Sequence, residues 1–132
     1  MYDFLQKFHS GWAYLALLLL VITVLNSVIG LTSKKEFTAK DRKIALFGLV
    51  FTHIQLLVGV ALYFLPQQKL GQSYADHPYV AILAIVLITI GWSKHKKAAT
   101  SESKYKTIAI FYGLGLLLIL ARIPWQLWFN KM

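Results

Sequence analysis

The histidines are the side chains in this sequence best suited to bind a metal ion or carry a proton. His53 interrupts the apolar run of residues 51–64, where an ionisable group is costly and is by default a candidate functional residue. His9 precedes the first apolar run and His77 opens the third, so both are expected at the same edge of a membrane. Arg122 lies inside the last apolar run, about two turns from its end.

Two neutral imidazoles from neighbouring helices can ligate a b-type haem, and histidine is also a common ligand of copper and zinc. We therefore take His9, His53 and His77 as candidate metal ligands. Arg122 is added as a cofactor-binding candidate that would neutralise a haem propionate or a quinone oxygen near the same face. His95 stands among Lys94, Lys96 and Lys97 and is interpreted as a solvated loop histidine.

Each candidate also has a structural interpretation, which stays open at this point. His53 can be hydrogen-bonded to a hydroxyl, amide or carbonyl group of a neighbouring helix, a contact worth about 1 kcal/mol. His77 can cap its helix, and His9 can be an interfacial side chain. Arg122 can reach the lipid phosphates or pair with Asp76.

The composition indicates a polytopic membrane protein, since 58% of the 132 residues are hydrophobic and the mean hydropathy is +0.59. The absence of cysteine excludes disulfides, thiolate metal sites and covalent haem attachment. The net charge of +9 does not indicate a nucleic-acid partner, because the cations cluster in two short connections between apolar runs.

The apolar runs predict one all-α transmembrane domain, residues 1–132, folded as an up-down-up-down four-helix bundle. The expected spans are about 12–32, 44–65, 77–93 and 107–129, preceded by an interfacial lead-in over residues 1–11. Two connections carry five lysines and arginines each, whereas the third carries only Lys69. The positive-inside rule therefore places the basic loops in the cytoplasm and both termini in the periplasm of a bacterial inner membrane.

The spans also predict depths and packing. At about 1.5 Å per residue, His53 lies near the midplane, ~15 Å from the level of His9 and His77, which conflicts with three histidines on one metal. Gln55 lies about 200° around the helix from His53, so the two face different neighbours. Thr38 and Asp41 have the spacing of a helix N-terminal cap. The glycines of the second and fourth spans are interpreted as close-packing positions; these are Gly48, Gly59, Gly113 and Gly115.

Several segments together resemble small four-span membrane proteins of Bacteroidota that are labelled "cytochrome b". The resemblance covers most of the chain and implies that His9, His53 and His77, but not His95, are the functional histidines. It rests on His9-Ser10, on residues 52–59 and 62–64, on His77, on residues 87–91 with Ser93-Lys94, and on Ile123-Pro124-Trp125. Asp76 stands where glutamate is expected, and the paired histidines of dihaem cytochromes b are missing.

The resulting expectation is an inner-membrane, cytochrome b-like protein that binds one haem b and passes electrons to or from quinol or a larger respiratory partner. No nucleophile with a base, carboxylate pair or phosphate loop lies within a span, so an electron carrier or accessory subunit is favoured over a stand-alone enzyme. Two alternatives remain. One is a cofactor-free accessory or assembly subunit of a larger membrane complex, and the other is a copper- or zinc-binding membrane protein. The lipid bilayer is a partner in every case.

Overall fold

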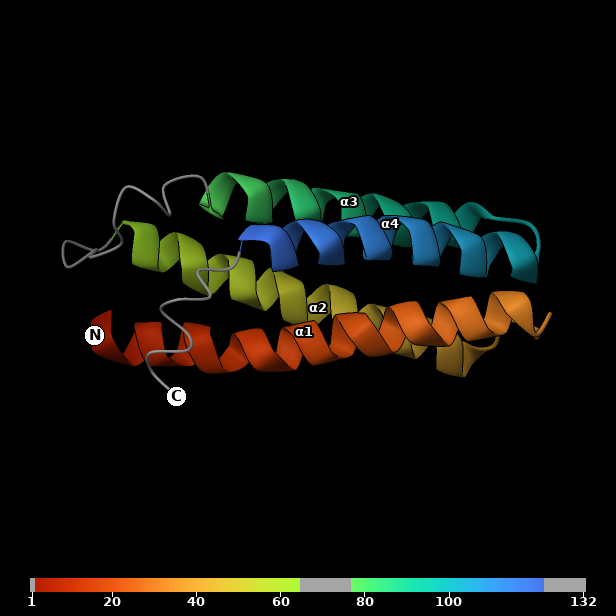
Figure 1. Ribbon diagram of the computed structural model, residues 1–132, viewed down its shortest axis with the longest axis horizontal. Coiled ribbons are helices and arrows are strands. Elements are labelled where there is room, and N and C mark those ends of the chain that lie inside the picture. Colours follow the sequence, from red (N-terminus) through yellow and green to blue (C-terminus); the bar gives the residue numbers. More distant parts are fainter. Residues whose placement is uncertain (1, 65–76, 123–132) are drawn as a thin grey trace.

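The computed structural model is an all-α bundle of four helices that run along one long axis (Figure 1). It describes the backbone of residues 2–64 and 77–122 and the side chains of residues 3–64 and 79–121. The helices are α1 (Tyr2–Thr32), α2 (Ala39–Tyr63), α3 (His77–Lys97) and α4 (Ser101–Arg122). The α1–α2 and α3–α4 turns lie at the same end of the bundle, as the up-down-up-down prediction requires (Figure 1). We call this the basic end.

All four helices are long and apolar enough to cross a membrane. Large apolar side chains cover the outside: Leu57 is 70% exposed and Leu117 is 64% exposed. Polar groups such as Thr23, Ser27 and Thr52 are buried instead. This distribution suits a lipid environment, where backbone and polar groups must be satisfied inside the protein. The protein is therefore a multi-pass membrane bundle.

The first helix begins earlier than the sequence predicts. Residues 1–11 were expected to form an interfacial lead-in ahead of a span that starts near residue 12, whereas residues 2–11 are the first turns of α1. Aromatic rings at a spacing of four residues explain the continuation. Phe8 stacks on Trp12 with 5.3 Å between ring centroids, and Trp12 stacks on Phe51 of α2 at 4.5 Å. The Trp12 indole also donates a hydrogen bond of 2.9 Å to the Phe51 carbonyl, which ties this extension to α2.

The turn from α1 into α2 has defined caps at both helix ends. Lys34 has a φ of 55°, the amide of Lys35 donates to the Gly30 carbonyl at 3.0 Å, and the amide of Lys34 approaches the Leu31 carbonyl at 3.4 Å. This is a Schellman cap with lysine at the position that glycine usually takes. At the start of α2, the Thr38 amide donates to the Asp41 carboxylate at 2.9 Å, so the predicted cap is confirmed.

Glycines bring the helices together as predicted at three of four positions. A Cβ on Gly115 would lie 2.9 Å from the Ala84 carbonyl oxygen of α3, and one on Gly48 would lie 3.1 Å from the Thr23 hydroxyl of α1. At Gly59 the neighbour is the His9 ring, 3.2 Å away, whereas Gly113 faces open space. The core between these contacts is centred on Leu20, Ala45, Ile88, Ile108 and Tyr112.

Candidate functional site

His53 points from α2 toward α3. Its Nδ1 lies 2.8 Å from the Leu49 carbonyl oxygen, and its Nε2 lies 3.3 Å from the hydroxyl of Thr89. Because a carbonyl only accepts, Nδ1 carries the proton, and in the neutral imidazole Nε2 is then an acceptor. These contacts are those expected of a hydrogen-bonded histidine between helices.

The Thr89 hydroxyl has only one proton to share between two acceptors. It donates to the Ile85 carbonyl of its own helix at 2.7 Å, which is shorter than its 3.3 Å contact with His53. A proton held by Ile85 is not available to the Nε2 atom of a neutral His53. Thr89 is also exposed on the outside of α3. The Nε2 atom can therefore accept a hydrogen bond from a further donor in the seam between α2 and α3.

His9 lies in a different seam, between α1 and α2. Its ring rests on Gly59, and its backbone carbonyl accepts a 2.8 Å hydrogen bond from the Gln55 amide. The side-chain oxygen of Gln55 is buried and has no hydrogen-bond partner among the described residues. Gln55 thus faces α1 while His53 faces α3, as their spacing on the helix predicts.

The structure corrects the predicted depth of His9. Trp12 is bonded to Phe51, and Gln55 is bonded to His9, so residues 51–55 of α2 lie beside residues 9–12 of α1. His53 is in the middle of that stretch. The His9 ring lies farther along α2, beside Gly59, which is six residues or about 9 Å from His53. The ~15 Å separation expected for the two histidines is therefore too large, because α1 extends to Tyr2.

This smaller difference in depth does not make the two histidines a pair of haem ligands. Two axial ligands must approach one iron from opposite sides, with the macrocycle between them. Here the His9 ring contacts the side of α2 that faces α1, and His53 projects from the side that faces α3. The body of α2 separates them, so these two residues do not fit as the axial ligands of one haem in this arrangement.

The other predicted site residues have side chains outside the described set. His77 begins α3 and Arg122 ends α4, but nothing further is described for either side chain, and Asp76 lies outside the described residues altogether. Along α3, His77 is twelve residues from Thr89, which places its backbone about 18 Å from the level of His53. Within the described part of the chain, no three His, Asp or Glu side chains gather as a metal site.

His95 was expected in a solvated loop, and this prediction is wrong. It lies in the last turn of α3, and only 1% of its surface is exposed. Its ring packs between Trp92 at 4.6 Å and Phe37 at 5.5 Å, and its Nδ1 donates to the Trp92 carbonyl at 2.6 Å. The neighbouring lysines point outward because a helix turns successive residues to different sides.

Asp41, also at the basic end, does more than cap α2 as the sequence predicts. Besides capping α2, its carboxylate accepts hydrogen bonds of 2.9 Å from Asn26 of α1 and from Tyr105 of α4. The Tyr105 hydroxyl also lies 3.1 Å from the Glu36 carbonyl oxygen. Asp41 therefore joins three helices, and we call Asp41, Asn26, Thr38 and Tyr105 the Asp41 hub.

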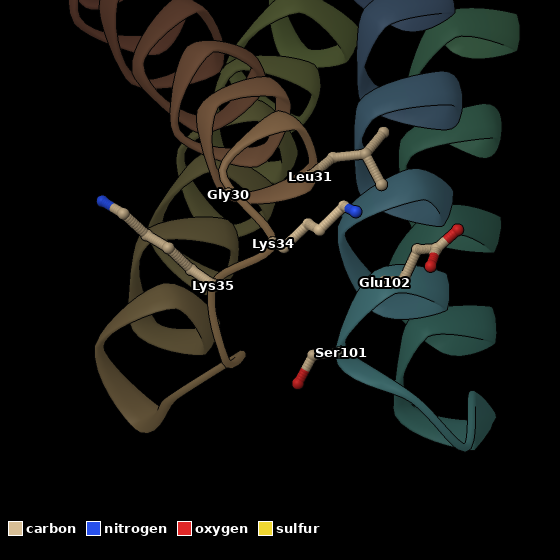
Figure 2. A pocket seen from close by; sticks show the side chains of 6 residues that line it. All are labelled: Gly30, Leu31, Lys34, Lys35, Ser101 and Glu102. Atoms are coloured by element: carbon tan, nitrogen blue, oxygen red, sulfur yellow. The ribbon is translucent and has the colours of Figure 1, made fainter.

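A shallow pocket of about 210 Å³ opens beside this hub, between the end of α1 and the start of α4 (Figure 2). The Lys34 side chain reaches toward α4 and Glu102, whereas Lys35 turns away from the pocket (Figure 2). The hydroxyl of Ser101 accepts a 2.8 Å bond from the Phe37 amide, which joins the two connections. The other lining residues are Gly30 and Leu31.

Comparisons with protein-family models, curated proteins and solved structures give no match for this chain.

Proposed function

We propose that this chain is a cofactor-free accessory subunit that docks against a larger protein complex of the bacterial inner membrane. The observation that carries the proposal is the contact between His53 and Thr89 in the exposed seam between α2 and α3. The basic end would face the cytoplasm and both termini the periplasm, because two basic connections flank the spans on one side and a single lysine lies in the connection on the other.

The seam presents polar groups where lipid would otherwise be in contact. Lipid tails cannot donate a hydrogen bond to the Nε2 atom of His53, and an unsatisfied polar group in hydrocarbon costs several kcal/mol. A transmembrane helix with a hydroxyl or amide donor can satisfy that atom while packing on the apolar side chains around it. Thr89 is exposed in this seam, so the described part of the chain does not cover it.

Site-specific photo-crosslinking in intact cells tests the docking face. A photoreactive amino acid at Val86, one turn from Thr89 on α3, should form a discrete adduct whose second protein is identified by mass spectrometry. The matched control is Leu117 of α4, which is also strongly exposed but lies on another helix. We expect the Val86 adduct to disappear in H53L/T89V. Equal adducts at Val86 and Leu117, or no dependence on His53 and Thr89, would contradict the proposal.

A second candidate function is a one-haem electron carrier, which uses His9 with His77 and exchanges electrons with quinol or a respiratory partner. A copper- or zinc-binding membrane protein that uses the same histidines is the non-haem form of this alternative. The buried oxygen of Gln55 beside His9 favours this alternative, because it has no partner among the described residues and a bound ligand is one way to satisfy such an atom. Haem would supply the redox chemistry, and Arg122 would neutralise a propionate.

An absorption spectrum of the purified protein separates the two candidates. The accessory-subunit proposal predicts no Soret band and no stoichiometric iron, copper or zinc by elemental analysis. A Soret band that is lost in H9A or H77A, but kept in H95A, would instead establish the haem carrier.

A further inference from the structure

Two cations from different helices lie over one tryptophan ring at the basic end. The Arg42 guanidinium of α2 and the Lys96 ammonium of α3 are each 5.7 Å from the centroid of the Trp92 ring. We call Arg42, Trp92 and Lys96 the Trp92 cation site. Cation–π attraction holds each positive group near the ring but leaves its N–H donors free.

The Trp92 ring is held in place by the packed residues around it. His95 packs against Trp92 and is itself buried, and its Nδ1–H is bonded to the Trp92 carbonyl. Lys104 is bonded through its ammonium group to the His95 carbonyl at 2.9 Å. The Trp92 ring is therefore part of the packed structure and is not a mobile surface side chain.

The site has excess positive charge without a matching acid in the described part of the chain. The charges of Lys104, Arg42 and Lys96 all act on His95. The nearest carboxylate in sequence, Asp41, takes its hydrogen bonds from Asn26, Thr38 and Tyr105. An anion that approaches the Trp92 ring is attracted by both charges.

An apolar stripe runs from Arg42 along the exposed side of α2 toward the middle of the membrane span. Leu46 and Val50 follow Arg42 at spacings of four residues on α2, and both are exposed. A molecule with an anionic head and an apolar tail fits both features, whereas a free phosphate ion fits only the first. Basic pockets between transmembrane helices are suited to anionic lipid headgroups.

We infer that the Trp92 cation site binds the phosphodiester headgroup of an anionic phospholipid, whose acyl chain lies along Leu46 and Val50. This inference does not depend on the accessory-subunit proposal, because it concerns the isolated protein in lipid. Each cation near an anionic headgroup contributes about fivefold in affinity, so the pair contributes on the order of 25-fold.

Quenching of Trp92 by brominated lipids measures this binding. The chain with W12F, W125F and W128F keeps Trp92 as its single tryptophan and is placed in vesicles with brominated phosphatidylglycerol or brominated phosphatidylcholine. We expect much stronger quenching by the anionic lipid in this parent protein. R42Q/K96Q should abolish the preference, and inorganic phosphate at the lipid concentration should not displace the lipid.

The matched control is K40Q/K97Q, which removes the same two charges from exposed positions on the same helices without touching the ring. It should keep the preference. Equal quenching by both lipids in the parent, equal loss in both double variants, or displacement by inorganic phosphate would overturn the inference.

A second measurement uses the unaltered chain, in case R42Q/K96Q does not fold. Mass spectrometry of the intact protein from mixed vesicles should show phosphatidylglycerol retained in preference to phosphatidylcholine. Equal retention would also overturn the inference.

Discussion

The two ends of the bundle use polar side chains in different ways. At the basic end, the carboxylate of Asp41 is bonded to Asn26 of α1 and Tyr105 of α4 while it caps α2. The two connections are also joined to each other, because the Phe37 amide donates to Ser101. These bonds span the bundle and fix how the helix pairs meet.

In the region of His9 and His53, each polar side chain bonds across only one pair of helices. Gln55 is bonded to His9 between α1 and α2, and His53 contacts Thr89 between α2 and α3. One amide oxygen there has no partner among the described residues, and Thr89 is exposed. A partner or ligand would bind to the acceptor atoms in this region, which are the side-chain oxygen of Gln55 and the Nε2 atom of His53. The Asp41 hub, in contrast, has a structural role.

Removing the Asp41 carboxylate should have the largest effect on stability. D41A leaves the donors of Asn26, Thr38 and Tyr105 without their acceptor, and we expect the free energy of unfolding to fall by about 3 kcal/mol. Unfolding in mixed detergent micelles, followed by circular dichroism, measures the change. The control E102A removes an exposed carboxylate at the same end and should change stability by less than about 0.5 kcal/mol.

Alanine substitution of two histidines compares the two regions directly. H95A removes a buried ring from between Trp92 and Phe37 and should cost about 2 kcal/mol. H53A removes one interhelical polar contact and should cost about 1 kcal/mol or less in the isolated protein. The same unfolding assay applies to both variants. A larger loss for H53A than for H95A would reverse the comparison.

A methyl group at Gly59 should test the packing of His9. G59A places a Cβ 3.2 Å from the His9 ring, and we expect a loss of about 1 kcal/mol because the ring must shift. In the H9A background the same substitution should stabilise the protein by about 0.5 to 1 kcal/mol, since the ring is gone and alanine is the better helix former. A double-mutant cycle measures this coupling, and additive effects would show that His9 does not rest on Gly59.

A gain in stability, in contrast to the losses above, is expected at the α1 cap. Lys34 has a left-handed backbone conformation, which glycine adopts without steric cost, so K34G should stabilise the protein by about 1 kcal/mol. K35G is the control at the next position, where glycine brings no such benefit. No gain for K34G over K35G in the unfolding assay would contradict the cap geometry.

The general fold follows from features that the sequence displays directly. Four apolar runs of spanning length, separated by short connections, predict four helices, and the confirmed Thr38–Asp41 cap sets the start of α2. The start of α1 was missed because residues 2–11 mix charged and aromatic side chains. The four-residue spacing of Phe4, Phe8 and Trp12 was the available signal for a continuous helix.

The site was less predictable, because its contacts depend on how separate helices meet. Three flanking lysines suggested that His95 was solvated, although its spacing of seven and three residues from Ile88 and Trp92 places it on the buried face. Nothing local indicates that Asn26 and Tyr105 converge on Asp41 from other helices. The seam that each histidine faces is likewise set by tertiary packing.

The central claim is that α2 separates His9 from His53, and crosslinking of introduced cysteine pairs tests it most directly. The chain contains no cysteine, so each pair can be examined alone in membranes. Under copper-phenanthroline oxidation, H9C/G59C and H53C/T89C should each form a disulfide rapidly, whereas H9C/H53C should not. A disulfide in H9C/H53C that forms as fast as in the other two pairs would contradict the claim and restore His9 and His53 as candidate ligands of one metal.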